Sequence, residues 1–479
     1  MNARALALLA LSVTTATAAR ANGPASPAQN ALPDSRSLRP EPPPQIPIEL
    51  PPALEQPASE GPLLSLADAL ERARQVSTDL AIAAERVIQA DDAVAKAYRA
   101  FRPTLTGNAS YTRNSQQQGY EYLDPTTEMA GFLYTQKTNA LAASLDANWQ
   151  FFNARAFPAL ANTKDQRAVS EFSQAQVRRD LLLSVCQTYL SAVQQQQLML
   201  AAFRRSAVAR DQAHQAIARY EAGLLQRASV MKAKLDVVNA DEEAQRDVFA
   251  LRDTKSSLAT LLDRHDIAFD LASPPDPAPA VSGEAHELLQ RALDSRPEMA
   301  AQLLQEKITA RVRTDAWAQF FPTLSLDGRA QTSNADQFPG YSAASWAVTL
   351  AISIPLYDGG FRYVQLKDAD SQERMALAQT RAERIKIEDE LRRALLDLDS
   401  ARALRSEAEQ SLEVAQENER LTRAQFDAGT ATQIEVSDAE ANLFLSEAQL
   451  LQQKLNVQLS ALQLARAVGA FDPTVSQGN

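Results

Sequence analysis

The residues that most often carry out chemistry are few in this sequence and lie far apart. Cys186 is the only cysteine, so no disulfide can form within the chain and no cysteine-based metal site exists. The three histidines, His214, His265 and His286, lack the spacing of metal ligands. The sequence contains no nucleophile elbow, phosphate-binding loop or metal-ligand constellation. It therefore predicts a protein that is not an enzyme and that holds no cofactor or metal.

Composition indicates an acidic protein built largely from helices. The 479 residues carry a net charge of −11, which argues against a nucleic-acid partner because phosphate binding needs a basic surface. Glycine is scarce, at 14 residues, and alanine, leucine, glutamine and arginine dominate long stretches. Such a composition favours long helices over compact α/β layers.

The N-terminus has the pattern of a signal peptide over residues 1–21. Arg4 supplies the positive charge, residues 5–13 form the apolar core, and residues 19–21 match an A-x-A cleavage site, with 16–18 as a competing site. No cysteine lies near the cleavage site, so we expect an exported protein without an N-terminal lipid anchor. No later apolar run is long enough to span a membrane as a helix, so entry into a membrane would require closed β-structure.

Residues 22–62 contain 12 of the 24 prolines and show no periodicity, which predicts an extended tether. The remaining chain shows an internal duplication. FRPTL at 101–105 returns as FFPTL at 320–324, and YEAG at 220–223 returns as FDAG at 426–429. Repeats of this size indicate two related structural units. The predicted units are 63–264 and 284–470, separated by a proline-rich loop at 265–283 and followed by a tail at 471–479.

Each unit contains a predicted β-hairpin, at 103–152 and 322–357. Their strands alternate apolar and polar residues, which places one apolar face opposite one polar face. The four segments are 104–113, 143–151, 323–332 and 345–354. Each has about the length of a tilted membrane strand. We interpret the acids Asp146 and Asp327 on the polar faces as the lining of a lumen. An alternative is two soluble hairpins packed on the helices. The first hairpin is longer, which predicts an outer loop at about 116–137.

Helices are predicted on both sides of each hairpin. One helix precedes each, at 66–100 and 284–317. Long helices follow at 155–219 and 361–426, each spanning about 100 Å at 1.5 Å per residue. They end at Gly223 and Gly429, and glycine suits the left-handed residue that ends a helix. Returning helices are predicted at 225–264 and 433–467, so each unit ends in a helical hairpin.

These motifs resemble the TolC-like outer-membrane efflux family over residues about 64–470. FRPTL and FFPTL precede the strands, PLYDGG at 355–360 joins a strand to a helix through Asp358, Gly359 and Gly360, and the two AG turns end the long helices. The first unit departs from the pattern, since Asn153-Ala154-Arg155 replaces the double glycine. The resemblance implies a mainly α protein with transmembrane β-structure. It implies a homotrimer whose twelve-stranded β-barrel, with four strands per protomer, continues into a long α-helical barrel. The 265–283 loop and the C-terminal tail would belong to an equatorial belt.

The resemblance also assigns roles to the helical-hairpin tips, which form the periplasmic gate and the docking surface for an adaptor protein. The matching tip residues are Tyr220, Gly223, Leu224, Phe426, Gly429 and Thr430. Acidic residues after the second tip, here Glu435 and Asp438, would form a ring at the narrowest opening. Like charges brought together there would raise the carboxylate pKa and favour cations. The alternative is that both are ordinary first-turn acids favoured by the helix dipole.

The tips depart from the family at one further point. The family archetype ties its tip shut with a tyrosine, an arginine and an aspartate. The corresponding positions here are Phe426, Ala431 and Ser229. We therefore expect that this particular polar latch is missing.

The function implied is passive export of small molecules or metal ions through the outer-membrane exit duct of a tripartite efflux system. The implied location is the outer membrane, with an extension through the periplasm. The implied partners are outer-membrane lipid, a periplasmic adaptor (membrane fusion) protein and, indirectly, an inner-membrane transporter. Two alternatives stay open: the outer-membrane channel of type I protein secretion, and a soluble periplasmic coiled-coil adaptor or scaffold.

Overall fold

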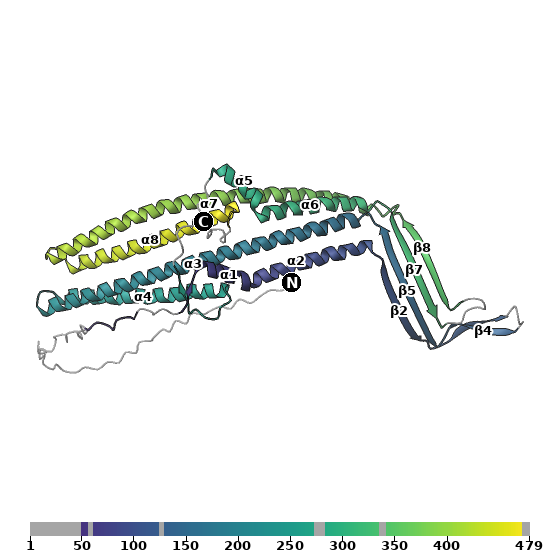
Figure 1. Cartoon of the computed structure of the whole chain (residues 1–479), viewed down its shortest axis with the longest axis horizontal. Coiled ribbons are helices and arrows are strands. Elements are labelled where there is room, and N and C mark those ends of the chain that lie inside the picture. Colours follow the sequence, from purple (N-terminus) through teal and green to yellow (C-terminus); the bar gives the residue numbers. More distant parts are fainter. Residues whose placement is uncertain (1–48, 56–60, 124–128, 273–282, 335–341, 472–479) are drawn as a thin grey trace, which may run out of the picture. The chain divides into compact units, whose positions relative to one another are not determined.

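The computed structural model describes residues 49–55, 61–123, 129–272, 283–334 and 342–471. The predicted signal peptide, most of the predicted tether, much of the proline-rich loop and all but the first residue of the predicted tail lie outside these residues. Helices make up most of the described chain, and a β-sheet joins one end of the long helices (Figure 1).

Four long helices form two antiparallel hairpins. Helix α3 (Ala156–Glu221) packs against α4 (Arg227–Leu261), and α7 (Phe361–Asp427) packs against α8 (Gln433–Val468). The predicted long helices are thus confirmed to within a few residues. Within the described residues, none of the helices combines the length and the apolar character needed to cross a membrane.

The seam of α7 follows the seven-residue spacing seen in the sequence. Its buried residues include Ile387, Ala394, Ala401 and Ala408 at one seam position. Alanine at that position lets the partner helix approach closely, because it adds little side-chain bulk. The helix α7 also contacts α6 (Pro297–Ala318), and α3 also contacts α2 (Thr78–Ala97) and α8, so the two hairpins belong to one helical body.

The shorter helices differ from the prediction, which extended each as one helix. The segment 66–100 divides into α1 (Leu66–Val76) and α2, because Ser77 is extended and its hydroxyl accepts a hydrogen bond from the Leu80 N–H at 3.3 Å. The segment 284–317 divides into α5 (Ala285–Ser295) and α6 at the extended residue Arg296. Pro297 causes this second break, because proline excludes the helical conformation from the residue before it. A 3₁₀ turn, η1 (Tyr98–Phe101), leads from α2 to the first strand.

All four predicted strands are confirmed. They are β2 (Thr104–Arg113), β5 (Asn139–Phe152), β7 (Thr323–Ser333) and β8 (Ala344–Ser353). They form one antiparallel sheet in the order β2-β5-β7-β8, so β5 and β7 join the two halves of the chain. Among the described residues, β2 and β8 each pair on one side only, which leaves the sheet with two edges.

The segment at about 116–137, predicted as an outer loop, lies outside the four-stranded sheet between β2 and β5, but it folds as a second hairpin, which was not predicted. Strand β3 (Gln118–Leu123) pairs antiparallel with β4 (Ala130–Gln136). Aromatic residues stabilise it, with the Phe132 and Tyr134 ring centroids 4.8 Å apart. In the sequence, the alternation of Tyr120 and Tyr122 with polar residues is the pattern that indicates strand β3.

A small buried core lies where α1, α3 and α4 meet the end of α8. Strand β1 (Leu63–Leu64) pairs in parallel with β6 (Asp270–Leu271), within the segment that was predicted as a loop. The fully buried hydroxyl of Tyr189 lies 2.9 Å from the Leu64 oxygen and 2.7 Å from the Ala272 oxygen. Cys186 belongs to the same core, and burial raises its pKa to about 12. The thiol therefore stays protonated, and Cys186 serves to fill the core.

Part of the predicted tether is held against the helices. Arg210 on α3 donates hydrogen bonds to the backbone oxygens of Pro51 at 2.8 Å and Pro52 at 3.0 Å. Leu54 packs against a cluster that contains Ala201 and Phe444. The segment 51–54 thus contacts the helical body.

Candidate functional site

The four-stranded sheet separates polar from apolar side chains across all four strands. In the register, Leu105 pairs with Ala147, which pairs with Gly328, and that residue pairs with Val348. Leu350 lies beside Leu326 one row further on. Large side chains on this face are exposed, with Leu350 at 69%. A contiguous exposed apolar face marks a surface that contacts a membrane or another protein.

The opposite face carries a ladder of hydrogen-bonded polar side chains. Arg329 on β7 donates to Asp146 on β5 at 2.5 Å, and Asn108 on β2 donates to the same carboxylate at 3.1 Å. Asn148 donates to Asp327 one row away. The two isolated acids noted in the sequence therefore lie next to each other on the polar face, each with a partner.

Aromatic side chains collect where strands meet helices. The rings of Phe101 and Phe157 lie 5.3 Å apart, and those of Phe320 and Tyr363 also lie 5.3 Å apart. The Trp149 indole donates to the Phe101 backbone oxygen at 3.2 Å. Aromatic rings with a polar edge favour the boundary between apolar and aqueous surroundings.

The Asp358-Gly359-Gly360 turn starts α7. Both glycines have positive φ, 70° and 85°, with open space at their Cβ positions, so the backbone conformation and not crowding calls for glycine. Asp358 accepts a hydrogen bond from the Gly360 N–H at 3.1 Å and from Arg362 Nε at 2.7 Å. In the first half Asn153 acts similarly, since its side-chain oxygen accepts from the Arg155 N–H at 3.1 Å.

The two helical-hairpin tips have the same backbone geometry. Gly223 and Gly429 have φ of 75° and 77°. The Leu224 N–H donates to the Arg219 oxygen, and the Thr430 N–H donates to the Gln425 oxygen, each at 2.9 Å. These bonds define a Schellman-type helix end. At the first tip Leu224 is 78% exposed, which leaves a large apolar side chain in solvent.

A contact between the two tips was not predicted from the sequence. The Arg219 guanidinium lies over the Phe426 ring at 4.6 Å and 3.7 Å from an Asp427 oxygen. It links α3 to α7 through a position, Phe426, where the family archetype has tyrosine. Only the register of the two tips reveals this pair, because Arg219 and Phe426 are far apart in the sequence.

Glu435 and Asp438 lie one turn apart at the start of α8, and both are exposed. Glu435 accepts hydrogen bonds from the Thr432 N–H at 2.6 Å and from its hydroxyl at 3.0 Å, which completes a capping box. These two bonds lower the pKa of Glu435. The helix-start interpretation of Glu435 thus has direct support within one chain. The predicted rise of the carboxylate pKa, caused by three like charges in a ring, applies to the assembled trimer and stays a prediction.

A third acid near the second tip escaped the sequence analysis. Glu440 on α8 accepts a hydrogen bond from Gln212 on α3 and lies 3.5 Å from Arg423 on α7. Burial raises the pKa of Glu440 to about 7, and the charges of Glu419 and Asp236 act in the same direction, against Arg423 and Gln212. Its side chain is 15% exposed. Among the described residues, no group of three histidine, cysteine or acidic side chains is placed to hold a metal ion.

Comparisons with known proteins agree with this geometry. The family model for outer membrane efflux proteins matches residues 288–470. The chain is 28% identical over 329 residues to outer membrane protein OprJ of Pseudomonas aeruginosa, covering 64% of each chain. The matched part is thus just under two thirds of the length of OprJ. The chain is thus similar to the TolC-like outer-membrane efflux family.

The similarity extends beyond the matched segment. Outer membrane protein TolC of Vibrio cholerae is 22% identical over 419 residues, with 85% of this chain and 91% of TolC covered. The solved structure of outer membrane protein VceC from Vibrio cholerae superposes with a TM-score of 0.68 at 20% identity, covering 84% of this chain and 96% of VceC. The fold of an outer-membrane efflux protein thus covers most of the chain.

Proposed function

We propose that this chain is the outer-membrane exit duct of a tripartite efflux system, which exports small molecules or metal ions passively across the periplasm and the outer membrane. The observation that carries the proposal is the sheet with one exposed apolar face and one hydrogen-bonded polar face, continued directly into long helices. Helix α3, with 66 residues, spans about 100 Å at 1.5 Å per residue. A duct of this kind needs no catalytic group.

The proposed assembly is a homotrimer. The sheet ends in the unpaired edges of β2 and β8, and an open edge in lipid leaves backbone groups without partners. Four strands cannot close a barrel alone, whereas three copies would supply twelve. The similar order of elements in the two halves supports an internal duplication, with α3/α4 corresponding to α7/α8. The same trimer would close the helices into a tube.

The partners follow from the two ends of the molecule. The apolar sheet face, with Leu350 and Trp346, would contact outer-membrane lipid. The helical tips, with the exposed side chain of Leu224, would dock a periplasmic adaptor protein. An inner-membrane transporter would supply energy through that adaptor, because the duct itself has no energy source.

The face assignment can be tested with a matched pair of lysines on adjacent residues of β8. Leu350→Lys puts a charge on the apolar face, and Thr349→Lys puts the same charge on the polar face beside Asp327. A lysine facing lipid at mid-depth costs about 2 to 4 kcal/mol in an outer-membrane barrel. We expect Leu350→Lys to reduce membrane-integrated, heat-modifiable trimer, and Thr349→Lys to leave it unchanged. Equal loss, or no loss, in both variants would contradict the proposal.

We also propose Glu435 and Asp438 as the acidic ring of the periplasmic gate. Three copies of each at a constriction would favour cations. Asp438 is the sharper test, because Glu435 also caps α8. Asp438→Ala should reduce cation selectivity in single-channel recordings. Glu242→Ala, at an exposed acid on α4, is the control for a general loss of charge and should leave the selectivity unchanged. Unchanged selectivity in Asp438→Ala and in the double variant with Glu435→Ala would remove the gate assignment and keep the duct.

A further inference from the structure

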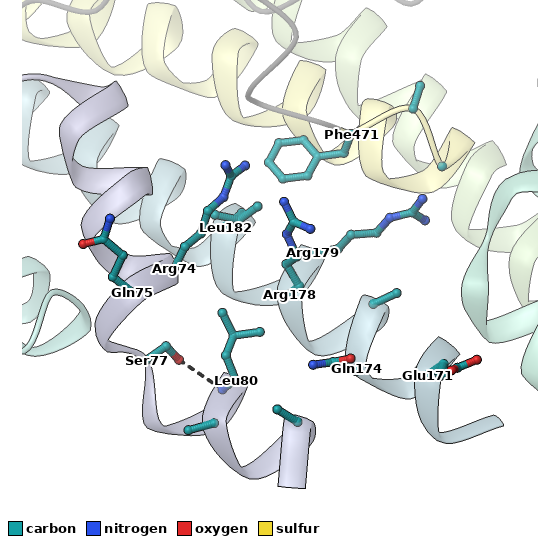
Figure 2. Close-up of a pocket in the computed structure, with 15 residues that line it drawn as sticks. Arg74, Gln75, Ser77, Leu80, Glu171, Gln174, Arg178, Arg179, Leu182 and Phe471 are labelled. Carbon is teal, nitrogen blue, oxygen red and sulfur yellow. Dashed lines mark hydrogen bonds between the residues drawn. The ribbon is translucent and has the colours of Figure 1, made fainter. Parts of the chain in front are cut away.

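A large cavity opens beside the break between α1 and α2. Its volume is about 1010 Å³, and it lies between that break, one face of α3 and the residues that follow α8. Figure 2 shows Ser77 at the break, with Gln174 and Leu182 on the facing helix and Phe471 above them. A cavity of this volume is large enough for a drug-sized molecule.

Two guanidinium groups converge in this cavity. Arg74 reaches in from α1 and Arg178 from α3, and both end on the side of the Phe471 ring (Figure 2). Arg179, the neighbour of Arg178, turns away and donates to the Ser295 oxygen at 3.4 Å.

The donors of Arg74 are not satisfied by the protein. Its Nε and Nη2 atoms are buried and have no hydrogen-bond partner within the described part of the chain. Its closest carboxylate oxygen, on Glu71, lies 3.7 Å from Nη1, which is an ion pair beyond hydrogen-bond distance. A buried charged donor without an acceptor is costly, so an acceptor from outside the chain would stabilise this arrangement.

Two acids in or near the lining are already engaged with other arginines. Glu171, which lines the cavity, pairs with Arg167 at 3.2 Å. Asp180, next to Arg179, pairs with Arg466 at 2.9 Å. Arg178 makes no hydrogen bond or ion pair with any described residue. In a chain with a net charge of −11, this cavity is therefore an unusual local excess of positive charge.

Part of the wall is apolar. Leu80, Ala84 and Ala175 line the cavity together with Leu182 and the buried ring of Phe471. Guanidinium groups bind carboxylates and other oxyanions through paired N–H donors, and an aromatic ring beside them favours a flat apolar body. The wall thus combines a site for an anionic head group with a site for a ring.

We propose that this cavity binds a small organic anion, with its carboxylate or sulfonate between Arg74 and Arg178 and its apolar ring system against Phe471 and Leu182. This site goes beyond the proposed duct, because passive conduction requires no ligand pocket. The head group supplies the acceptors that the Arg74 Nε and Nη2 atoms lack. The ring body occupies the apolar part of the cavity.

The test uses the full-length protein in nanodiscs and 2-naphthoate as the probe, with titration calorimetry as the readout. The neutral amide 2-naphthamide keeps the ring and removes the charge. We expect 2-naphthoate to bind at least about tenfold more tightly than the amide, given the strength of charge-assisted hydrogen bonds. Arg74→Gln and Arg178→Gln should each remove most of that preference. Arg179→Gln, the matched control, should change it less than about twofold, since its guanidinium turns away.

Several outcomes would overturn the proposal. Equal affinity for naphthoate and naphthamide would show that the arginines do not recognise the head group. Binding of inorganic phosphate without binding of naphthoate would overturn the organic-anion assignment. A naphthoate affinity that falls in Arg179→Gln but not in Arg178→Gln would overturn the assignment of Arg178 to the site. The exposed residue Arg178 keeps the test usable if Arg74→Gln fails to fold. Conductance of the same preparations tests the duct separately.

Discussion

Replacement of Glu440 by glutamine should make the protein more stable at pH 8 and reduce the loss of stability on going from acid to neutral pH. Glu440 lies among α3, α4, α7 and α8, so it titrates inside the helical body near the tips. The groups that face it are Gln212 from α3, Asp236 from α4, and Glu419 and Arg423 from α7. Glutamine keeps the shape and the hydrogen-bonding capacity of the side chain and removes its charge.

The magnitude follows from the pKa of Glu440. Burial raises this pKa from 4.5 to about 7. One pKa unit corresponds to about 1.4 kcal/mol. Because the folded-state pKa is raised, the stabilising contribution is complete below about pH 4.5 and is lost as the pH rises through about 7. The expected loss is about 2 to 3 kcal/mol per chain, since the side chain keeps 15% exposure to solvent.

The assay is guanidinium unfolding in detergent at pH 4.5, 6 and 8, followed by circular dichroism. The difference between wild type and Glu440→Gln cancels the titration of groups that do not interact with Glu440, so it reports on this carboxyl and its immediate partners. That difference should grow in favour of the variant across this window. The exposed acid Glu407 on α7 provides a matched control, and Glu407→Gln should follow wild type at every pH. A constant difference between Glu440→Gln and wild type would refute the reasoning, as would a variant that is less stable at pH 8.

Three further changes probe the core and the tips. Tyr189→Phe leaves the Leu64 and Ala272 oxygens without their shared donor and should lower the unfolding free energy by about 1 to 3 kcal/mol in chemical unfolding; an unchanged midpoint would exclude that role. Gly429→Ala should lower the stability of the tip by about 1 to 2 kcal/mol through its positive φ alone, since no atom lies within 4 Å of the new Cβ. Gly429→Asn should lower it less, because asparagine tolerates positive φ better. Hydrogen exchange at the tip measures this difference, and equal protection in both variants would contradict it. Arg219→Ala should raise the open probability in bilayer recordings, whereas Arg420→Ala, which removes a surface pair with Glu417, should not.

The elements with strict periodicity were predictable from the sequence. Strand alternation gave the four strands of the sheet, and the glycines at 223 and 429 gave the ends of the long helices. The missed hairpin β3–β4 also alternates, but the length difference between the two halves favoured a loop there. Pro297 was a readable sign of the break between α5 and α6, because it restricts Arg296.

The contacts between distant segments were not predictable in the same way. Arg219 meets Phe426, and Gln212 meets Glu440, only after two separate helical hairpins pack side by side. No local pattern in a single sequence encodes such pairs. Glu435 illustrates a different limit, because its position fits both a gate acid and a capping box. Its hydrogen bonds to Thr432 establish the capping role within one chain, and its gate role depends on the assembled trimer.

The most direct test of the proposed duct is single-channel conductance of the purified, unmodified protein in planar lipid bilayers. We expect stable current steps that are selective for cations, with a lower selectivity when Glu435 and Asp438 are both replaced by alanine. Protein that is folded in detergent yet neither inserts nor conducts would contradict the account and would favour a soluble helical scaffold.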